Sequence, residues 1–521
     1  MTSSNHYDAI IIGAGHNGLA AGAYLARAGW RTLILERRPI IGGLAATEEL
    51  VPGFRFDTGF PAAPLLRPEV VAELDLPRHG LEWVQPEVHL FAPAQGGGIT
   101  LWADAEKTAA SLAQVSPRDA ARFPAFMGFV RRVSGVIQAM MSLTPPEIKA
   151  APSLRELLPW ARLALRVRGL GEREMMAFLR VLPMSVHTFL AEWFEAPALR
   201  GALGVFGTVG AMLGPLGAGT ALNFLYHFGA GGAPGWVRGG AGQLAAALAG
   251  AAKAFGAEIQ AGVPVRSILI ENGRATGVET ASGERAHARV VVSSADPRHT
   301  FFDLLGARHL PVRVVRRVQN IRFRGSTATV HLALRGLPDF GVDPARLRGW
   351  VVLCPGLMHL ERAYDDAKYG RFSSNPALLV SIPSLREAGR AAEGQHTLSA
   401  MVRYAPYCLR EGDWETQRPR LEQAVIDTLS AYAPDLPGLV LAARSFTPLD
   451  YAREFGLSEG SWMHGQMGLD QLLFMRPIPG WGRYRTPVAG LYLCGSGTHP
   501  GGGLTAAPGR NAARVILEVE G

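Results

Sequence analysis

Cysteine is scarce in this chain. Only Cys354, Cys408 and Cys494 occur among 521 residues, and they lie far apart. Without a CxxC pair, neither a redox-active disulfide nor a thiolate metal site can be assembled locally. The sequence therefore predicts no metal ion, and it favours a reducing, cytoplasmic location.

Dense runs of basic residues are also missing. The formal net charge is +8, but the Lys and Arg residues are scattered, which argues against nucleic acid as a partner. Charged residues make up 18% and hydrophobic residues 48%, with a mean hydropathy of +0.11. This balance predicts a folded protein with an apolar cavity or surface, and the length predicts at least two domains.

No long apolar run is free of interruption. Only a short polar tail, Met1 to His6, precedes the first expected strand, so we expect no signal peptide. The uncharged stretch 201–237 contains many glycines. Glycine alone does not exclude a membrane helix, but a closely packed, buried segment is the favoured interpretation because no second span accompanies it.

The first residues do carry a nucleotide-binding pattern. The apolar run 9–12 is typical of a buried parallel strand. Gly13 then suits a tight turn, Gly15 lets a diphosphate approach the backbone, and Gly18 lets the following helix pack closely. The three glycines therefore predict a site for the diphosphate of a dinucleotide.

The next residues complete this unit. Residues 19–28 suit a helix, 31–35 a second strand, and Glu36 at its end can accept both ribose hydroxyls. An acid at this position disfavours a 2′-phosphate. Strand, glycines, helix, strand and acid in this order are far more specific than an isolated GxGxxG.

The chain is expected to have an α/β fold with an interrupted nucleotide-binding domain. Segments 1–105, 236–297 and 478–521 are predicted to form that domain. The first insertion, 106–235, has the apolar spacing of helices. The second insertion, 298–477, alternates between strand and helix patterns and predicts an α+β substrate domain.

Particular elements support this division. In the middle segment we expect a helix over 244–255 and strands over 258–261, 264–270, 274–280 and 286–293. In the insertions we expect helices over 122–140, 154–167 and 420–433, the last one beginning earlier if Asp413 caps it, and one sheet containing 326–334, 377–383 and 396–403.

The C-terminal glycines favour a flavin over a nicotinamide. A second strand and GxGxxG unit for NAD(P)H is not visible, and 229–235 lacks a preceding apolar strand. The segment 495–504 allows backbone to approach a flat ring. A helix beginning near Gly503 is expected to direct its free N–H groups at the pyrimidine carbonyl of a flavin.

These motifs carry a family resemblance. The markers are 11–19, 36–38 with Gly42 and Gly43, 465–471, 491–503 and 508–512. With them the sequence resembles the phytoene desaturase-like, amine oxidase-related flavoproteins. The resemblance implies a Rossmann-type, glutathione reductase-like FAD-binding domain in three segments, with the substrate domain over the flavin. It also implies substrates that are long apolar molecules, which relatives desaturate, saturate, isomerise or oxidise.

The cofactor is accordingly expected to be FAD. The residues expected to bind it are Gly13, Ala14, Gly15, Asn17, Gly18, Glu36, Arg37, Gly42, Gly43, Leu44, Gly239, Val265, Gly495, Ser496, Gly503, Leu504 and Thr505.

Two histidines are candidates for proton transfer. By the resemblance, His499 lies in the segment that passes the isoalloxazine, and an imidazole suits proton exchange near neutral pH. A role in bracing that loop is the competing interpretation. His464 is the second candidate, and a loop histidine with satisfied hydrogen bonds is its alternative. His16 is interpreted as a packing residue close to the flavin.

Apolar residues are available for a substrate tunnel. The candidates are Met175, Met176, Phe178, Met184, Phe189, Phe206, Met212, Phe224, Tyr226 and Phe228. Each of them also suits a plain core. Acidic residues are sparse around them, which weakens an amine-oxidase interpretation, because a cationic substrate needs a counter-charge or an aromatic cage.

The segment 153–168 combines Leu and Trp with several Arg residues. A basic helix that packs on its own domain is the favoured interpretation. Peripheral contact with an anionic membrane surface is the alternative. A homo-oligomer is left open.

The leading hypothesis is a FAD-dependent oxidoreductase that transfers hydride from a hydrophobic, isoprenoid or acyl substrate to flavin N5. Dioxygen or a quinone would reoxidise the flavin. Two alternatives stay open: a flavin-binding interaction protein with little turnover, and a redox-neutral flavin-dependent isomerase.

Overall fold

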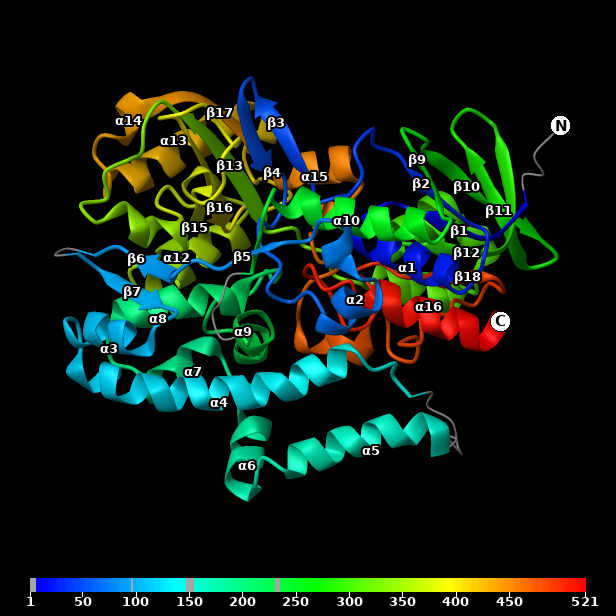
Figure 1. Cartoon of the computed structure of the whole chain (residues 1–521), viewed down its shortest axis with the longest axis horizontal. Helices are drawn as coiled ribbons and strands as arrows, with labels where there is room; N and C mark the ends of the chain where they lie inside the picture. Colours follow the sequence, from blue (N-terminus) through cyan, green and yellow to red (C-terminus); the bar gives the residue numbers. More distant parts are fainter. Residues whose placement is uncertain (1–5, 95–96, 147–153, 230–234) are drawn as a thin grey trace.

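The computed structural model describes residues 6–94, 97–146, 154–229 and 235–521. For 154–156 it describes the backbone alone. Figure 1 shows two sheets side by side along the longest axis, with a layer of helices along one edge of the molecule. The expectations that concern 1–5, 153 and 230–234 lie outside the described residues.

The first sheet has seven strands in the order β10-β11-β12-β1-β2-β9, with β18 beside β12. They are β1 (His6–Ile12), β2 (Thr32–Glu36), β9 (Glu258–Ala261), β10 (Val265–Glu271), β11 (Arg274–Thr280), β12 (Arg285–Ser293) and β18 (Leu491–Leu493). β1 lies parallel to both β2 and β12. Both faces of this central strand are buried, which explains its unbroken apolar run.

Helices cover the two faces of this sheet. One face packs against α1 (His16–Arg27), α10 (Ala241–Ala254) and α16 (Ala507–Glu520), largely through alanine. The other face packs against the turn η3 (His299–Leu304) and α11 (Val312–Gln319). Small side chains let the helices approach the strands closely, so the carboxyl ends of β1 and β2 meet the start of α1 at one edge.

The second sheet has the order β17-β13-β16-β15-β14-β6-β7. Its strands are β6 (Val88–Ala92), β7 (Ile99–Trp102), β13 (Thr327–Leu334), β14 (Trp350–Leu353), β15 (Ala377–Ser381), β16 (His396–Arg403) and β17 (Val440–Phe446). The three strands expected in one sheet therefore do pair. The boundary at 105 differs, because β6 pairs in parallel with β14 through Trp350 and Leu90, so 88–102 extends the second sheet.

Helices form a third region below the sheets (Figure 1). They are α3 (Ala105–Ala113), α4 (Pro117–Met141), α5 (Leu154–Arg168), α6 (Glu172–Val181), α7 (Val186–Trp193), α8 (Pro197–Gly204), η2 (Val205–Thr208) and α9 (Thr220–Phe228). The part of the glycine-rich stretch that the structure describes is mostly buried here, with an exposed turn around Leu216. Among the described helices, none combines the length and the apolar character that a membrane crossing requires.

The remaining elements connect these regions. They are β3 (Thr47–Val51), β4 (Phe54–Asp57), α2 (Pro68–Glu73), β5 (Trp83–Val84), β8 (Trp236–Val237), α12 (Leu357–Lys368), α13 (Trp414–Ser430), α14 (Leu436–Leu439) and α15 (Pro448–Phe455). The Asp413 side chain accepts a hydrogen bond from the backbone N–H of Thr416, so α13 begins earlier than position 420 for the reason expected from the sequence.

Candidate functional site

Three glycines shape the turn between β1 and α1. Gly13 has φ +92°, a backbone conformation that favours glycine. A Cβ on Gly18 would lie 2.0 Å from the carbonyl oxygen of Gly13, so the helix packs directly on the turn. At Gly15 the nearest such atom is 4.0 Å away, which leaves its backbone open to a ligand. These contacts match the roles expected from the spacing of the three glycines.

Glu36 closes the far side of this turn. Its Oε2 atom accepts a hydrogen bond from Ala14 N at 2.8 Å, and Oε1 accepts one from Arg38 N at 2.9 Å. The side chain is only 6% exposed. Each carboxylate oxygen has a further lone pair, so the fixed acid can still accept the ribose hydroxyls of a dinucleotide.

A long cleft runs from Glu36 past the turn to the C-terminal glycines, and we call it the cofactor cleft. It encloses about 1180 Å³, including solvent at its mouth. Its lining consists of Ile12, Gly13, Gly15, His16, Asn17, Leu35, Glu36, Arg37, Arg38, Gly42, Gly43, Leu44, Pro264, Val265, Ser294, Ala295, Asp296, His299, Leu304, Phe455, Gly456, Leu457, Trp462, His464 and Ser496.

Most of the expected cofactor residues meet in this cleft. Those that line it are Gly13, Gly15, Asn17, Glu36, Arg37, Gly42, Gly43, Leu44, Val265 and Ser496. The residues fit FAD, because open backbone at Gly15, an acid at the strand end and a long cleft are what the diphosphate, ribose and flat rings of this cofactor need.

Several expected residues lie elsewhere. Ala14 and Gly18 are packed behind the turn, and a Cβ on Gly495 would lie 2.3 Å from the carbonyl oxygen of Ser294. Thr505 is fully buried, and its Oγ1 atom accepts a hydrogen bond from Ala507 N. Gly239 donates its N–H to Glu387 Oε2 at 2.9 Å. None of these five residues lines the cofactor cleft.

The last helix begins later than expected. The sequence suggested a start near Gly503, but α16 starts at Ala507 after Ala506, which has φ +56°. The left-handed residue breaks the path of the chain, so Gly503 and Leu504 remain in a loop. Both residues line a neighbouring cavity, and the N-terminal turn of α16 follows them.

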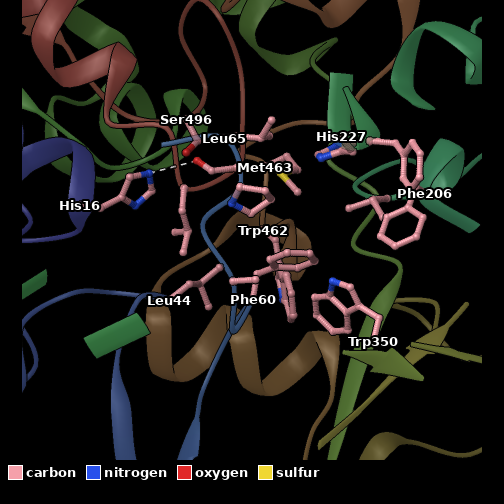
Figure 2. Close-up of a pocket in the computed structure, with 16 residues that line it drawn as sticks. His16, Leu44, Phe60, Leu65, Phe206, His227, Trp350, Trp462, Met463 and Ser496 are labelled. Carbon is pink, nitrogen blue, oxygen red and sulfur yellow. Dashed lines mark hydrogen bonds between the residues drawn. The ribbon is translucent and has the colours of Figure 1, made fainter. Parts of the chain in front are cut away.

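This neighbouring cavity is apolar, and we call it the apolar cavity (Figure 2). It encloses about 830 Å³, including open solvent. It is lined by His16, Leu44, Phe60, Ala62, Pro64, Leu65, Phe206, Val209, His227, Phe228, Trp350, Trp462, Met463, Ser496, Gly503 and Leu504. His16, Leu44, Trp462 and Ser496 also line the cofactor cleft, so the two spaces adjoin.

His16 stands where the two spaces meet. Its Nε2–H donates to the carbonyl oxygen of Gly503 at 3.1 Å, the contact drawn in Figure 2. Burial lowers the pKa of His16 to about 4, so the ring is neutral at physiological pH. A packing role close to the flavin was expected for this residue, and the contact also ties the first glycine turn to the last one.

The two candidate proton carriers occupy different places. His464 lines the cofactor cleft, and its buried Nδ1 atom has no hydrogen-bond partner in the described part of the chain. His499 is fully buried, lines neither space, and donates from Nε2 to the carbonyl oxygen of Met140 at 3.0 Å. Burial lowers the pKa of His499 to about 4. Its geometry favours bracing, while a catalytic role remains a prediction.

Arg476 holds the loop that carries His464, a role that sequence reasoning missed. Its guanidinium is buried and donates to the carbonyl oxygens of Gln471, Gly465 and Ser496, each at 2.6 Å, and to that of Met463. An arginine before a proline gives no sequence signal for this role. The contacts fasten the 463–471 loop to Ser496, which lines the cleft.

The apolar cavity draws on side chains that sequence reasoning did not single out. Phe60, His227, Trp350 and Trp462 come from four separate parts of the chain. Of the expected tunnel residues, only Phe206 and Phe228 line it. Phe189 and Phe224 belong to the core beside it, and Met176 is 58% exposed. No local pattern could have assembled this set.

A dinucleotide cleft that shares lining residues with an apolar cavity is the arrangement that a flavoprotein oxidoreductase needs. The chain belongs to the family of flavin containing amine oxidoreductases, whose model matches residues 18–517. FAD is therefore its cofactor. The match also confirms the resemblance to amine oxidase-related flavoproteins.

Named relatives span almost the whole chain. Pyridine nucleotide-disulfide oxidoreductase domain-containing protein 2 of Rattus norvegicus is 36% identical over 98% of this chain and 93% of its own length. A subunit of the limonene dehydrogenase of Castellaniella defragrans is 28% identical over 99% and 96%. An oxidoreductase from Methanosarcina mazei shares the fold, with a TM-score of 0.61 at 17% identity over 98% of this chain and 99% of that one.

Proposed function

We propose that this flavoprotein oxidises an apolar substrate of the isoprenoid or acyl class. The observation that carries the proposal is the lining of the apolar cavity, which among the described residues contains no Asp, Glu, Lys or Arg side chain. A cationic amine would lose its hydration there, would find no counter-charge, and would depend on contacts with the faces of Phe60, Trp350 and Trp462 alone. An uncharged hydrocarbon skeleton gains from the same surroundings, because water is displaced from aromatic and aliphatic side chains.

The protein's part in this reaction is to position the substrate and to exclude water. When bound, FAD supplies the hydride acceptor at N5 and passes two electrons on to dioxygen or a quinone. Phe60, Trp350 and Trp462 wall the cavity and hold an apolar skeleton against the border with the cleft. Loss of a C–H hydride and of a neighbouring proton then leaves a C=C bond.

The proton needs an acceptor with a free lone pair, which an imidazole offers only in its neutral form. We propose His464 as the first candidate, because its unpartnered Nδ1 atom belongs to a residue that lines the cleft. Burial lowers its pKa, so the neutral form is present at physiological pH. His499 is the second candidate, because its Nδ1 atom is also without a partner among the described residues.

The domain division follows the sheets. We propose that the first sheet and its helices form a three-segment, glutathione reductase-like FAD domain. The substrate domain then comprises the second sheet, including β6 and β7, and the helical region. This assignment is supported by strands that come from 6–36, 258–293 and 491–493 in one sheet.

We further propose that α5 touches an anionic membrane surface, which would deliver an apolar substrate. Leu157, Leu158 and Leu165 are 40%, 52% and 67% exposed on one side of this helix. Trp160 is held on another side, where its Nε1–H donates to the carbonyl oxygen of Thr144. Figure 1 shows α5 and α6 at the lower margin of the molecule, below α4. Exposed leucines next to arginines are typical of an interfacial helix.

The proposed reaction is tested by anaerobic mixing of the FAD-loaded protein with limonene, a compact apolar isoprenoid, and separately with benzylamine. Bleaching of the flavin absorption by limonene alone is the expected result. Bleaching by benzylamine alone would show that the cavity serves a cationic substrate and would overturn the proposal. Consumption of dioxygen or a quinone after bleaching then identifies the electron acceptor.

A further inference from the structure

The apolar cavity has few polar side chains, and two of them are already engaged. His16 donates to Gly503, as described above. Ser496 accepts a hydrogen bond at Oγ from Asn17 Nδ2 at 3.2 Å. The indole N–H of Trp462 has no partner in the described residues, but this side chain borders both spaces. Either the cofactor or a substrate can therefore accept its hydrogen bond.

His227 differs from these residues. It lies in the last turn of α9 and lines the apolar cavity without lining the cofactor cleft. Its Nε2 atom is buried, and no group in the described part of the chain makes a hydrogen bond to it. Buried polar atoms in folded proteins nearly always have a partner, and leaving one unpaired destabilises the fold. A bound ligand can supply the missing partner.

The imidazole of His227 is held in its neutral form. Burial lowers its pKa to about 3, and the positive charge of Arg403 contributes to the shift. Arg403 is itself fully buried and donates to Thr327 Oγ1 at 2.8 Å and to the carbonyl oxygen of Thr208. A neutral imidazole offers one N–H and one lone pair, so it pairs with an uncharged oxygen group rather than serving as a counter-ion.

The position of His227 shows which end of a ligand it would meet. Figure 2 shows His16 and Ser496 at one side of the cavity and His227 at the other side, next to Phe206. His16 and Ser496 border the cofactor cleft, whereas His227 does not. A group that pairs with His227 therefore sits at the end of the substrate that lies away from the flavin.

We propose that the substrate carries a single hydrogen-bonding oxygen, a hydroxyl or a carbonyl, at the end remote from the flavin, and that His227 binds it. This inference rests on the proposed function, because it presupposes that the apolar cavity binds the substrate and adds a chemical feature of that substrate. The reacting carbon atoms then lie in the hydrocarbon part, near His16. His227 fixes the register of the substrate along the cavity and so determines which C–H bond faces the cofactor.

The test compares ligands that share one skeleton. Limonene, perillyl alcohol and perillaldehyde differ only in a methyl, hydroxymethyl or aldehyde group. Dissociation constants are measured with the FAD-loaded protein under anaerobic conditions by quenching of tryptophan fluorescence, since Trp350 and Trp462 line the cavity. We expect the two oxygenated compounds to bind at least about tenfold more tightly than limonene, the effect of one good buried hydrogen bond.

Variants assign this preference to His227. We expect His227→Phe to make the three constants equal, and His227→Gln to restore part of the preference through its amide. The matched control is His359→Phe. His359 is half-buried in α12 and lines neither the apolar cavity nor the cofactor cleft, and its Nε2 atom has no hydrogen-bond partner among the described residues, so the preference should survive.

Two results would overturn the inference. One is a wild-type protein that binds neither oxygenated compound more tightly than limonene, failure to bind included. The other is a preference that persists in both His227 variants. Failure of the proposed oxidation can be told apart from failure of this inference, because flavin bleaching reports the reaction and tryptophan fluorescence reports binding. A preference for oxygenated ligands without any bleaching would reject the reaction and retain the role of His227 in binding.

Discussion

The cofactor cleft and the apolar cavity adjoin each other, yet they are built in different ways. At the first turn the cleft is made by backbone at Gly13, Gly15, Gly42 and Gly43, with Glu36 at the strand end, and side chains from 264–304 and 455–496 complete it. The cavity is made by side chains from separate elements, from Phe60 to Leu504. The packed backbone at Gly18 and Gly42 tolerates almost no added atom. A cavity that is made of side chains can change its shape by substitution, so its ligand can diverge while the cofactor stays the same.

The largest effect is expected in the cleft. In Gly18→Ala, the new Cβ would lie 2.0 Å from the Gly13 carbonyl oxygen. A Cβ is fixed rigidly to its backbone and the oxygen belongs to backbone, so neither can turn aside and α1 has to move. We expect FAD content to fall by at least about tenfold, or ~1.4 kcal/mol of binding free energy. The ratio of flavin absorption to protein after gel filtration measures it.

Gly135→Ala is the control for this substitution. Gly135 lies inside α4, and no heavy atom comes within 4 Å of its added Cβ. Alanine favours a helix over glycine by about 1 kcal/mol, so stability should rise slightly and FAD content should not change. Normal FAD content in Gly18→Ala would contradict the view that backbone packing at this turn limits the cleft.

The next effect separates the two regions. Val209 is 2% exposed and lines the apolar cavity, so the larger ring of Val209→Phe would occupy the space that a substrate needs. We expect kcat/KM for an apolar substrate to fall about tenfold with FAD content unchanged, and overpacking to cost about 1–3 kcal/mol of stability. Steady-state rates and flavin absorption measure both quantities.

Val312→Phe provides the comparison. Val312 is 70% exposed in α11 and lies outside both spaces, so the same change should alter neither rate nor FAD content. A loss of FAD together with activity in Val209→Phe would show that a change in the apolar cavity also disturbs FAD binding in the cleft.

The same contrast explains what the sequence could predict. Gly13, Gly15, Gly18 and Glu36 act through local spacing, and their positions in the turn follow from it. The strands at 258–261 and 274–280 have the bounds expected, because alternation and turn residues mark them. The start of α16 was misplaced by four residues, because the left-handed conformation of Ala506 has no sequence signal.

Long-range pairing was harder to predict. β6 lies within the first 105 residues but pairs with β14, which is more than 250 residues away in the chain. The tunnel residues were chosen for their apolar character, which Phe189 and Phe206 share. Only packing of the helical region decides that Phe206 lines the cavity while Phe189 stays in the core. Neither distinction is encoded in a short stretch of sequence.

A smaller effect concerns His499 and depends on pH. Its folded pKa is lowered to about 4, below the usual value near 6.5, because the neutral ring is buried. The unfolded chain therefore binds more protons between these values. Stability from this residue is fully present above pH 6.5 and is lost as the pH falls towards 4. At pH 5 the loss amounts to about 2 kcal/mol.

His499→Gln should remove this dependence while keeping a donor for the Met140 carbonyl. We expect the difference in the free energy of unfolding between pH 7 and pH 5 to shrink by ~2 kcal/mol relative to wild type. Chemical denaturation at the two pH values measures it. If turnover also survives with FAD bound, His499 is a brace. A loss of turnover in this variant with FAD retained would instead identify it as the proton carrier.

The smallest effect concerns the route into the cavity and leaves the cleft unchanged. Replacing Leu158 and Leu165 by Glu removes two exposed apolar side chains from α5 and adds negative charge. We expect co-sedimentation with phosphatidylserine-containing vesicles to fall several-fold, because burial of each leucine contributes at most about 2 kcal/mol and anionic lipid repels the new charges. The double variant Leu216→Glu and Leu441→Glu changes the charge equally at two leucines that are 46% and 44% exposed elsewhere. Equal loss in both double variants would show that net charge, and not contact through α5, governs binding to the vesicles.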